Sequence, residues 1–244
     1  WTLKREDFST ISFKGFEAKY KPSGVSGQQR LFYDRNAPFQ KDVKLWDNYV
    51  PSVTADKPIA YIIPQAWSRV AELLQLNGVL MKRLSADTEI DVESYYVDDY
   101  KSPARPFEGH FLHTQVKVKS VQQKLKYYAG DYVVYVNQKQ NRYIVETLEP
   151  QGADSFFAWN FFDSILGQKE HFSAYVFEDS AEELLNKDAT LKLKLDAEKA
   201  KDPELAKSAD AQLNWLYRNS PFYEKTYSRY PVGKLTRDIK LEIR

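Results

Sequence analysis

The chain has 244 residues, of which 43% are hydrophobic, 15% aromatic and 28% charged, a composition typical of a folded domain that can bury a sizeable core. Its 35 basic and 34 acidic residues give a net charge of +1, so no electrostatic footprint for nucleic acid or an anionic membrane stands out. The absence of cysteine excludes disulfides, thiolate zinc sites and a cysteine nucleophile, and no apolar run approaches the roughly 18–20 residues of a membrane span.

Residues 1–56 are rich in turn-forming residues and read as extended. Loosely spaced aromatic and aliphatic residues are interrupted by prolines and glycines, including Pro22, Gly24 and Pro38. We expect two or three short strands, or an extended arm. Because the chain begins with Trp1 and not with Met, we also expect a fragment or a processed product.

A regular unit begins at Lys57. Residues 59–63 form an apolar run that ends at Pro64 and predicts a buried strand. The next segment places apolar residues on one helical face up to Asn77-Gly78, a typical helix end, and residues 79–84 predict a second strand. The connection favours a parallel pair. Residues 90–100 and 109–119 predict two further strands.

A second unit follows Gly130. Residues 131–136 predict a strand, 137–141 a turn and 142–149 a helix that Pro150 stops. The two units share the order of apolar strand, polar turn and helix, which suggests two related halves of one sheet.

The remainder reads as helical. Asp154 can cap a helix over residues 154–166, Ser180 and Glu183 form a capping-box pattern, and Asp202-Pro203 predicts a further helix start. Residues 186–201 predict a solvated helix and residues 234–244 a frayed tail. We therefore predict an α/β (or α+β) fold with a mixed sheet. Its parts are an extended arm (1–56), a core domain (57–180) and a helical C-terminal extension (181–244) that packs on the core.

The histidines are the first residues to consider for catalysis or metal binding, because the chain has only three of them. Glu108, His110 and His113 form the sequence EGHFLH, which superficially resembles a metal cluster. Residues three apart on a strand point to opposite faces, whereas zinc helices place ligands four apart. Two interpretations of this segment therefore compete, a metal site and a strand-entry turn with ordinary histidines. We predict neither catalytic nor metal-binding residues. No phosphate-binding loop or nucleophile elbow occurs.

Residues 154–179 carry the densest aromatic surface. Three interpretations stay open for it: core packing, an interface with a neighbouring domain, and a carbohydrate-stacking platform. The candidates for core or interface are Phe156, Phe157, Trp159, Phe161 and Phe162.

Three segments together carry a resemblance to a known family: KPIAYIIPQAWSRVAELLQLNGV, AGDYVVYVNQKQNRYIVETLEP and DSFFAWNFFDSILGQKEHFSAYVFED. They resemble the region that follows the catalytic domain in bacterial zinc carboxypeptidases of the carboxypeptidase A type, over roughly residues 13–230. The matching positions are Gly130, Tyr132, Val133, Val134, Asn137 and Gln138.

The chemistry of that family needs zinc held by an H-x-x-E pair and a distant histidine. No H-x-x-E occurs here, because the third residue after each histidine is His113, Val116 or Ala174. The resemblance therefore implies that the peptidase domain lies upstream in the same polypeptide and holds the zinc, with no cofactor in this chain. Some members carry an amidotransferase-like C-terminal domain, but such enzymes use a cysteine that this chain lacks.

The function that the resemblance implies is that of a periplasmic or secreted, non-catalytic accessory domain. It would pack on the upstream peptidase domain and shape substrate access, without partners among nucleic acids and without a membrane span. Two alternatives remain. One is a stand-alone peptide- or glycan-binding module with an aromatic platform, and the other is an independent enzyme with a pocket around Glu108, His110 and His113.

Overall fold

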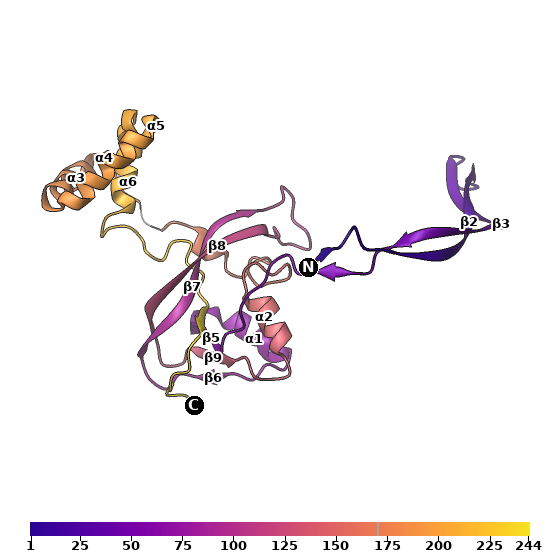
Figure 1. Cartoon of the computed structure of the whole chain (residues 1–244), viewed down its shortest axis with the longest axis horizontal. Coiled ribbons are helices and arrows are strands. Elements are labelled where there is room, and N and C mark those ends of the chain that lie inside the picture. The colour runs from indigo at the N-terminus through magenta and orange to yellow at the C-terminus, as the bar shows by residue number, and fades with distance from the viewer. Residues whose placement is uncertain (170) are drawn as a thin grey trace. The chain divides into compact units, whose positions relative to one another are not determined.

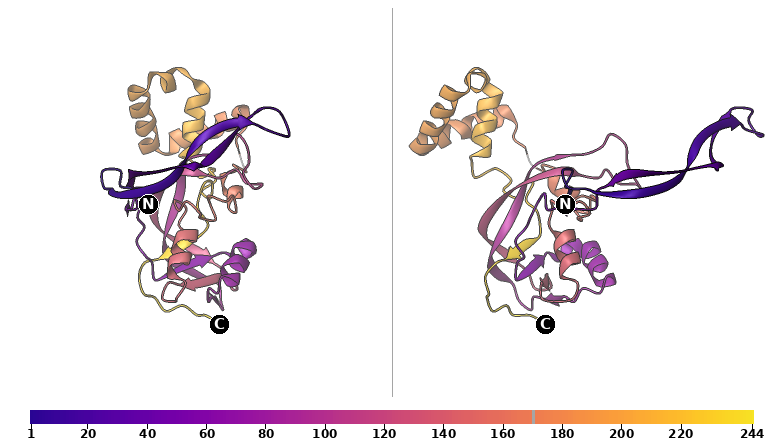
Figure 2. Two further views of the ribbon diagram at one scale, coloured as in Figure 1. Left: turned by 90° about the vertical axis from the view of Figure 1, so that its right-hand side faces the viewer. Right: turned by 45° about the vertical axis from the view of Figure 1, so that its right-hand side comes forward.

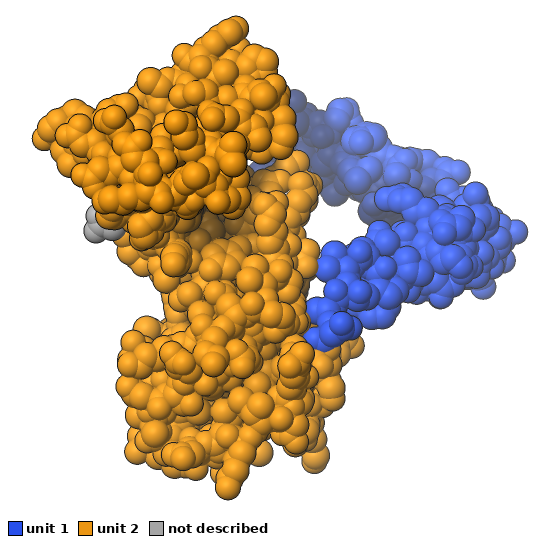
Figure 3. Space-filling model, turned by 60° about the vertical axis from the view of Figure 1, so that its left-hand side comes forward, with its two compact units in different colours: residues 1–56 blue, residues 57–244 orange. Residues whose placement is uncertain are grey.

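The structure is a computed structural model that describes residues 1–169 and 171–244 (Figure 1). The chain divides into two compact units, Trp1–Asp56 and Lys57–Arg244, which Figure 3 colours separately. The first unit contains a pair of short strands and one long hairpin. The second contains a six-stranded sheet with two helices, and a further group of four helices over residues 174–218.

The first unit is dominated by the hairpin of β2 (Ser9–Pro22) and β3 (Gln29–Leu45), which pair in an antiparallel register. Next to it, β1 (Thr2–Leu3) pairs with β4 (Tyr49–Val50). Phe16 pairs with Pro38 but the following residue, Glu17, pairs with Asp34, so β3 carries three extra residues, 35–37. The expected short strands are thus replaced by one long ribbon, in which Pro38 is tolerated because each strand has a free edge.

The second unit is built on a sheet with the strand order β6-β9-β5-β10-β7-β8, and each of its neighbouring pairs is antiparallel. The bounds of its strands are β5 (Ala60–Ile63), β6 (Lys82–Arg83), β7 (Thr88–Lys101), β8 (Thr114–Tyr127), β9 (Tyr132–Tyr135) and β10 (Gly233–Leu235). The α/β (or α+β) class is confirmed, and its sheet pairs take the antiparallel form that is usual in α+β folds.

Both predicted strand–turn–helix units are present. After β5, the 3-10 turn η1 (Gln65–Trp67) leads into α1 (Ser68–Leu76), which ends at Asn77 with Gly78 in the left-handed conformation at φ +76°. After β9 comes α2 (Asn141–Leu148). The predicted strands β5 and β6 do run parallel to each other, since both are antiparallel to β9, but they do not form a pair, because β9 lies between them.

The C-terminal strand is the largest correction to the sequence prediction. Residues 234–244 were expected to be a frayed tail, yet β10 is fully buried and lies between β5 and β7. Ile243 also bridges Leu84. A three-residue strand has too short an apolar pattern to be recognised, and its place in the sheet comes from pairing with strands far away in the chain.

Alternation along the strands produces one core on each face of the sheet. Tyr61 and Ile63 face α1, α2 and the aromatic turns that follow α2, whereas Ala60 and Ile62 face the other side, with Leu84 and Val133. Burial on both faces explains why residues 59–63 read as a continuous apolar run.

The predicted helix over residues 154–166 is wrong. The segment forms successive turns and only its end is helical, as the 3-10 helix η2 (Asp163–Leu166). Asn160 adopts φ +66°, and the Phe161 amide donates to the Phe156 carbonyl, five residues back. An α-helix would spread these aromatic rings around its whole circumference, whereas turns allow three of them to enter the core.

The later helices are α3 (Ala174–Lys187), α4 (Ala189–Lys201), α5 (Pro203–Lys207) and α6 (Ala209–Arg218). They share a separate core of Phe177, Ala181, Leu191, Leu195, Leu213, Leu216 and Tyr217. The Asp202 cap is confirmed, since its side chain accepts from the Glu204 and Leu205 amides. The Ser180 capping box is wrong, because α3 has already begun at Ala174 and runs through the predicted boundary at residue 180.

Candidate functional site

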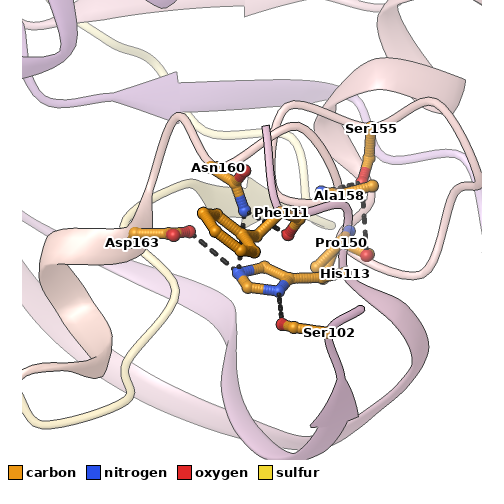
Figure 4. A network of polar contacts seen from close by, with 8 residues as sticks. All are labelled: Ser102, Phe111, His113, Pro150, Ser155, Ala158, Asn160 and Asp163. Carbon is orange, nitrogen blue, oxygen red and sulfur yellow. Dashed lines mark hydrogen bonds and ion pairs between the residues drawn. The ribbon is translucent and has the colours of Figure 1, made fainter. Parts of the chain in front are cut away.

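The polar cluster whose groups are best suited to catalysis is centred on His113, which is buried just before β8 (Figure 4). Its Nδ1 lies 2.7 Å from Ser102 Oγ, and its Nε2 lies 2.9 Å from Asp163 Oδ1. Ser102 follows β7 directly and Asp163 begins η2. Three segments distant in sequence thus meet at one imidazole ring.

The local fold fixes this ring in place. The His113 backbone amide donates to the Ala158 carbonyl oxygen at 2.9 Å, and the ring packs against Tyr100 and Phe157 at centroid distances of 4.5 and 5.0 Å. Asn160 donates from Nδ2 to the Phe111 carbonyl oxygen and lies 3.2 Å from His113 Nε2. The left-handed backbone of Asn160 is what directs its amide toward the histidine.

A serine hydrogen-bonded to a histidine that is in turn hydrogen-bonded to an aspartate is the arrangement of a catalytic triad, in which the histidine relays the proton of the nucleophile. The relay requires the ring to carry its proton toward Asp163 and to accept the proton of Ser102. Acyl transfer also needs N–H donors where the oxyanion develops, commonly the amide that follows the nucleophile. That residue is Pro103, which has no N–H. The geometry therefore favours a structural cross-link between segments over a nucleophilic site.

Glu108, His110 and His113, which the sequence left open as an alternative metal or enzyme site, are not brought together around one point. Phe107 and His110 exchange backbone hydrogen bonds across a tight turn whose central residues, Glu108 and Gly109, have φ of +48° and +81°. The His110 ring packs on Trp159 at 5.4 Å, while His113 faces Ser102 and Asp163. Among residues 1–169 and 171–244, no group of three or more metal-ligand side chains is placed to hold an ion. The residues present do not fit the zinc of the carboxypeptidase family.

The five aromatic candidates divide into two groups. Phe156, Phe157 and Phe162 lie in the core, where Phe162 packs edge-on against Trp67 at 4.8 Å. Trp159 and Phe161 are half-buried. Together with Phe107 and His110 they form a surface group, which we term the aromatic cluster. Phe107 is its most accessible member, at 56% exposure.

A second polar network joins β10 to the end of α2, and its members are buried except for Tyr95, which is half-buried. Lys234, on β10, lies 3.0 Å from Glu149 Oε1 and donates to the Tyr95 hydroxyl at 2.8 Å. The Tyr61 hydroxyl donates to the same Glu149 oxygen at 2.6 Å. Burial first, and then the Glu149 charge, raise the pKa values of Tyr61 and Tyr95 above their ordinary value. Every polar group here has a partner inside the protein, which favours a structural role.

Sequence reasoning singled out His113 and overlooked its partners. Ser102, Asn160 and Asp163 carry no local pattern that would distinguish them from other polar loop residues. Lys234 was assigned to the tail. Only the pairing of distant strands brings these groups together.

No family model matches the chain, and no solved structure matches it. The chain is similar to carboxypeptidase 2 of Trichophyton tonsurans, with 32% identity over 104 residues, and to carboxypeptidase 2 of Trichophyton rubrum, with 31% identity over 106 residues. A probable carboxypeptidase 2 of Arthroderma benhamiae is 29% identical over 102 residues. These matches cover 42–43% of this chain and 19–20% of each relative.

The chain thus spans about a fifth of the length of the curated relatives that it matches. These relatives are fungal and give no support to a bacterial origin. Within the described residues, no helix combines the length and apolar character needed to cross a membrane. The similarity identifies a region of this chain as carboxypeptidase-related.

Proposed function

We propose that this chain is a non-catalytic accessory region of a zinc carboxypeptidase, which packs on the peptidase domain of the same polypeptide and shapes substrate access. The observation that carries the proposal is the similarity to proteins named carboxypeptidase 2, which is confined to about a fifth of their length. Most of such a protein then lies outside the matched region, where a peptidase domain with its own zinc ligands can be accommodated.

The environments of the histidines support this role. His113 is engaged with Ser102 and Asp163, and His110 packs on Trp159. His171 packs on Phe172 at 4.6 Å. With no H-x-x-E in the sequence, these histidines are tied to local packing and hydrogen bonding, and zinc chemistry is assigned to the peptidase domain.

The aromatic cluster supplies a surface for the proposed contact. The Phe107 and Trp159 rings are accessible and their centroids lie 6.5 Å apart, and large aromatic side chains that remain accessible are typical anchors of protein interfaces. A periplasmic or secreted location, in a bacterial parent protein, is part of the same proposal.

The test compares the 244-residue chain with the full-length polypeptide. We expect the chain alone to release no C-terminal amino acid from peptides, with or without added zinc. In the full-length protein, the substitutions Phe107→Ser and Trp159→Ser should lower the thermal midpoint and change KM. Tyr175→Ser, at a more accessible aromatic of α3 outside the aromatic cluster, serves as the control. Zinc-dependent turnover by the isolated chain would overturn the proposal.

The exposed part of the aromatic cluster also favours a second candidate, a stand-alone peptide- or glycan-binding module. Half-accessible rings such as Trp159 can stack on sugar faces or hold apolar peptide side chains. Calorimetric titration of the isolated chain with defined oligosaccharides and peptides distinguishes the two. Saturable binding that Trp159→Ser abolishes would favour the binding module, whereas the absence of binding to every ligand tested would favour the accessory role.

A further inference from the structure

The hairpin of β2 and β3 exposes more apolar surface than an isolated ribbon can sustain. Two-stranded hairpins are marginally stable in water, because one ribbon cannot bury a hydrophobic face. Here many large apolar side chains remain accessible: Ile11, Phe13, Phe16, Tyr20, Leu31, Tyr33 and Leu45. Both strands pair only with each other, so each also has an unpaired edge. Such a ribbon needs a partner.

The strand register shows how these side chains are arranged. In the half of the hairpin that is far from the turn, Ile11 pairs with Val43 and Gly15 with Phe39. These residues share one face of the ribbon with Phe13. In the half nearest the turn, the apolar pairs are Phe16 with Pro38, Ala18 with Tyr33, and Tyr20 with Leu31, which share the opposite face. The apolar set therefore changes face between Gly15 and Phe16.

This change of face coincides with the irregularity in β3. Two-stranded ribbons twist strongly, and extra residues in one strand increase the twist. Figure 2 shows the ribbon twisting along its length. The apolar residues therefore form two patches, one on each face of the ribbon, which adjoin at the irregularity. We term the two patches together the apolar stripe.

A hollow at the crossover joins the two halves of the apolar stripe. It is lined by residues of both faces, Gly15 and Phe39 from one and Phe16 and Pro38 from the other, with Lys14 and Gln40 at its edge. The Phe39 ring lies over Gly15, where an added Cβ would be 2.8 Å from Cζ of the ring. The absence of a side chain at Gly15 thus makes room for the Phe39 ring.

The charges around the apolar stripe define its partner. Residues 14–44 contain seven lysines and arginines against three acidic residues, a balance of +4 from 7 − 3. Lys41 lies 5.1 Å from the centroid of the Phe39 ring, which holds its ammonium group beside the apolar stripe, and Lys21 and Lys44 lie 4.7 and 4.2 Å from the rings of Phe32 and Phe8. A second copy of the hairpin would bring these positive charges together, whereas an acidic surface would complement them.

We propose that the hairpin is a docking arm whose apolar stripe binds a folded protein surface with an apolar projection surrounded by carboxylates. Its occupant is the remaining part of the carboxypeptidase polypeptide. This inference rests on the proposed function, and it names a contact separate from the aromatic cluster. The projection packs on Phe16 and Phe39, and the carboxylates pair with the lysines of the hairpin.

Hydrogen exchange of the β2 and β3 amides tests the docking arm. In the isolated 244-residue chain these amides should exchange rapidly, and in the full-length polypeptide at least about tenfold more slowly, because docking suppresses local opening. The substitutions Phe16→Ser and Phe39→Ser should abolish the slowing. Phe32→Ser is the matched control, because Phe32 pairs with Lys19 on the polar side of the same strand. High salt should weaken the protection of the unsubstituted protein.

Three outcomes would overturn the docking arm. The first is equally rapid exchange in both proteins. If deletion of residues 57–244 from the full-length polypeptide still altered peptide turnover, the proposed function would hold without the docking arm. The second is slow exchange in the isolated chain that depends on its concentration, which would assign the hairpin to a second copy. The third is slowing by phosphatidylserine-containing vesicles but not by the full-length polypeptide, which would assign it to a membrane.

Discussion

Lys234 and Glu149 form an ion pair of 3.0 Å between β10 and the end of α2, with side chains that are 3% and 8% exposed. The two residues are far apart in sequence, and both side chains are almost completely shielded from solvent. The Tyr61 and Tyr95 hydroxyls complete the hydrogen bonding of the pair. The pair thereby ties the last strand of the chain to the core of its sheet.

The first prediction concerns removal of one partner. Lys234→Met should destabilise the chain by about 3–5 kcal/mol in urea unfolding, because it leaves the Glu149 carboxylate buried without a counter-charge. Adding Glu149→Gln should recover part of this loss. Lys187→Met breaks an equally short but exposed pair with Glu183 and should leave the midpoint unchanged. Equal effects of the two lysine substitutions would contradict the buried ion pair.

The second prediction concerns Gly233 and Tyr127. A Cβ at position 233 would lie 2.1 Å from the Tyr127 hydroxyl, so Gly233→Ala should destabilise by about 1–3 kcal/mol through overpacking. The Tyr127 hydroxyl has no hydrogen-bond partner in the described chain, so Tyr127→Phe should be neutral or stabilising. In a double-mutant cycle Tyr127→Phe should rescue part of the Gly233→Ala loss. Simple additivity would argue against their contact.

The third prediction concerns alkaline pH. Burial raises the pKa values of Tyr61, Tyr95 and Tyr230 above the ordinary value of 10.0, so the unfolded chain releases these protons before the folded chain does. Stability should therefore be fully present below pH 10.0 and should fall as pH rises above it. Chemical unfolding across this range measures the slope, and Tyr61→Phe should make it shallower. A flat profile would show that these phenols ionise freely in the folded state.

The fourth prediction concerns the group of helices α3–α6. The chain segments on either side of the group meet, since the Lys169 amide donates to Glu224 Oε2 and the Ser228 amide to the Ile165 carbonyl oxygen, each at 2.9 Å. The group also has its own core. Replacing residues 170–223 by a glycine–serine linker of about four residues should leave a folded sheet. Amide NMR shifts of β5 and β10 would check this, and loss of their dispersion would show that the helices are needed for folding.

The fifth prediction concerns the role of His113. As a structural cross-link, His113→Leu should destabilise by about 1–3 kcal/mol, because the hydrogen bonds of the buried ring to Ser102 and Asp163 are both lost. A fluorophosphonate probe should not label Ser102, since Pro103 provides no oxyanion donor. Mass spectrometry of the treated chain checks this. Labelling of Ser102 that His113→Leu abolishes would instead indicate a nucleophilic serine.

The elements predicted with the correct structure are those whose signals are local. The apolar run of β5, the helix end at Asn77-Gly78 and the Asp202-Pro203 helix start each depend on residues within a few positions of one another. The helix over residues 154–166 failed for the opposite reason. Its composition permits a helix, but burial of Phe157 and Phe162 in the core selects turns.

Local patterns thus determined that the chain folds, which short segments form strands and helices, and that no H-x-x-E zinc motif is present. Tertiary structure alone decided that residues 233–235 complete the sheet and that Ser102, His113 and Asp163 meet. It also decided how the apolar residues of the hairpin divide between its two faces, because strand register, and not residue type, sets which side chains share a face.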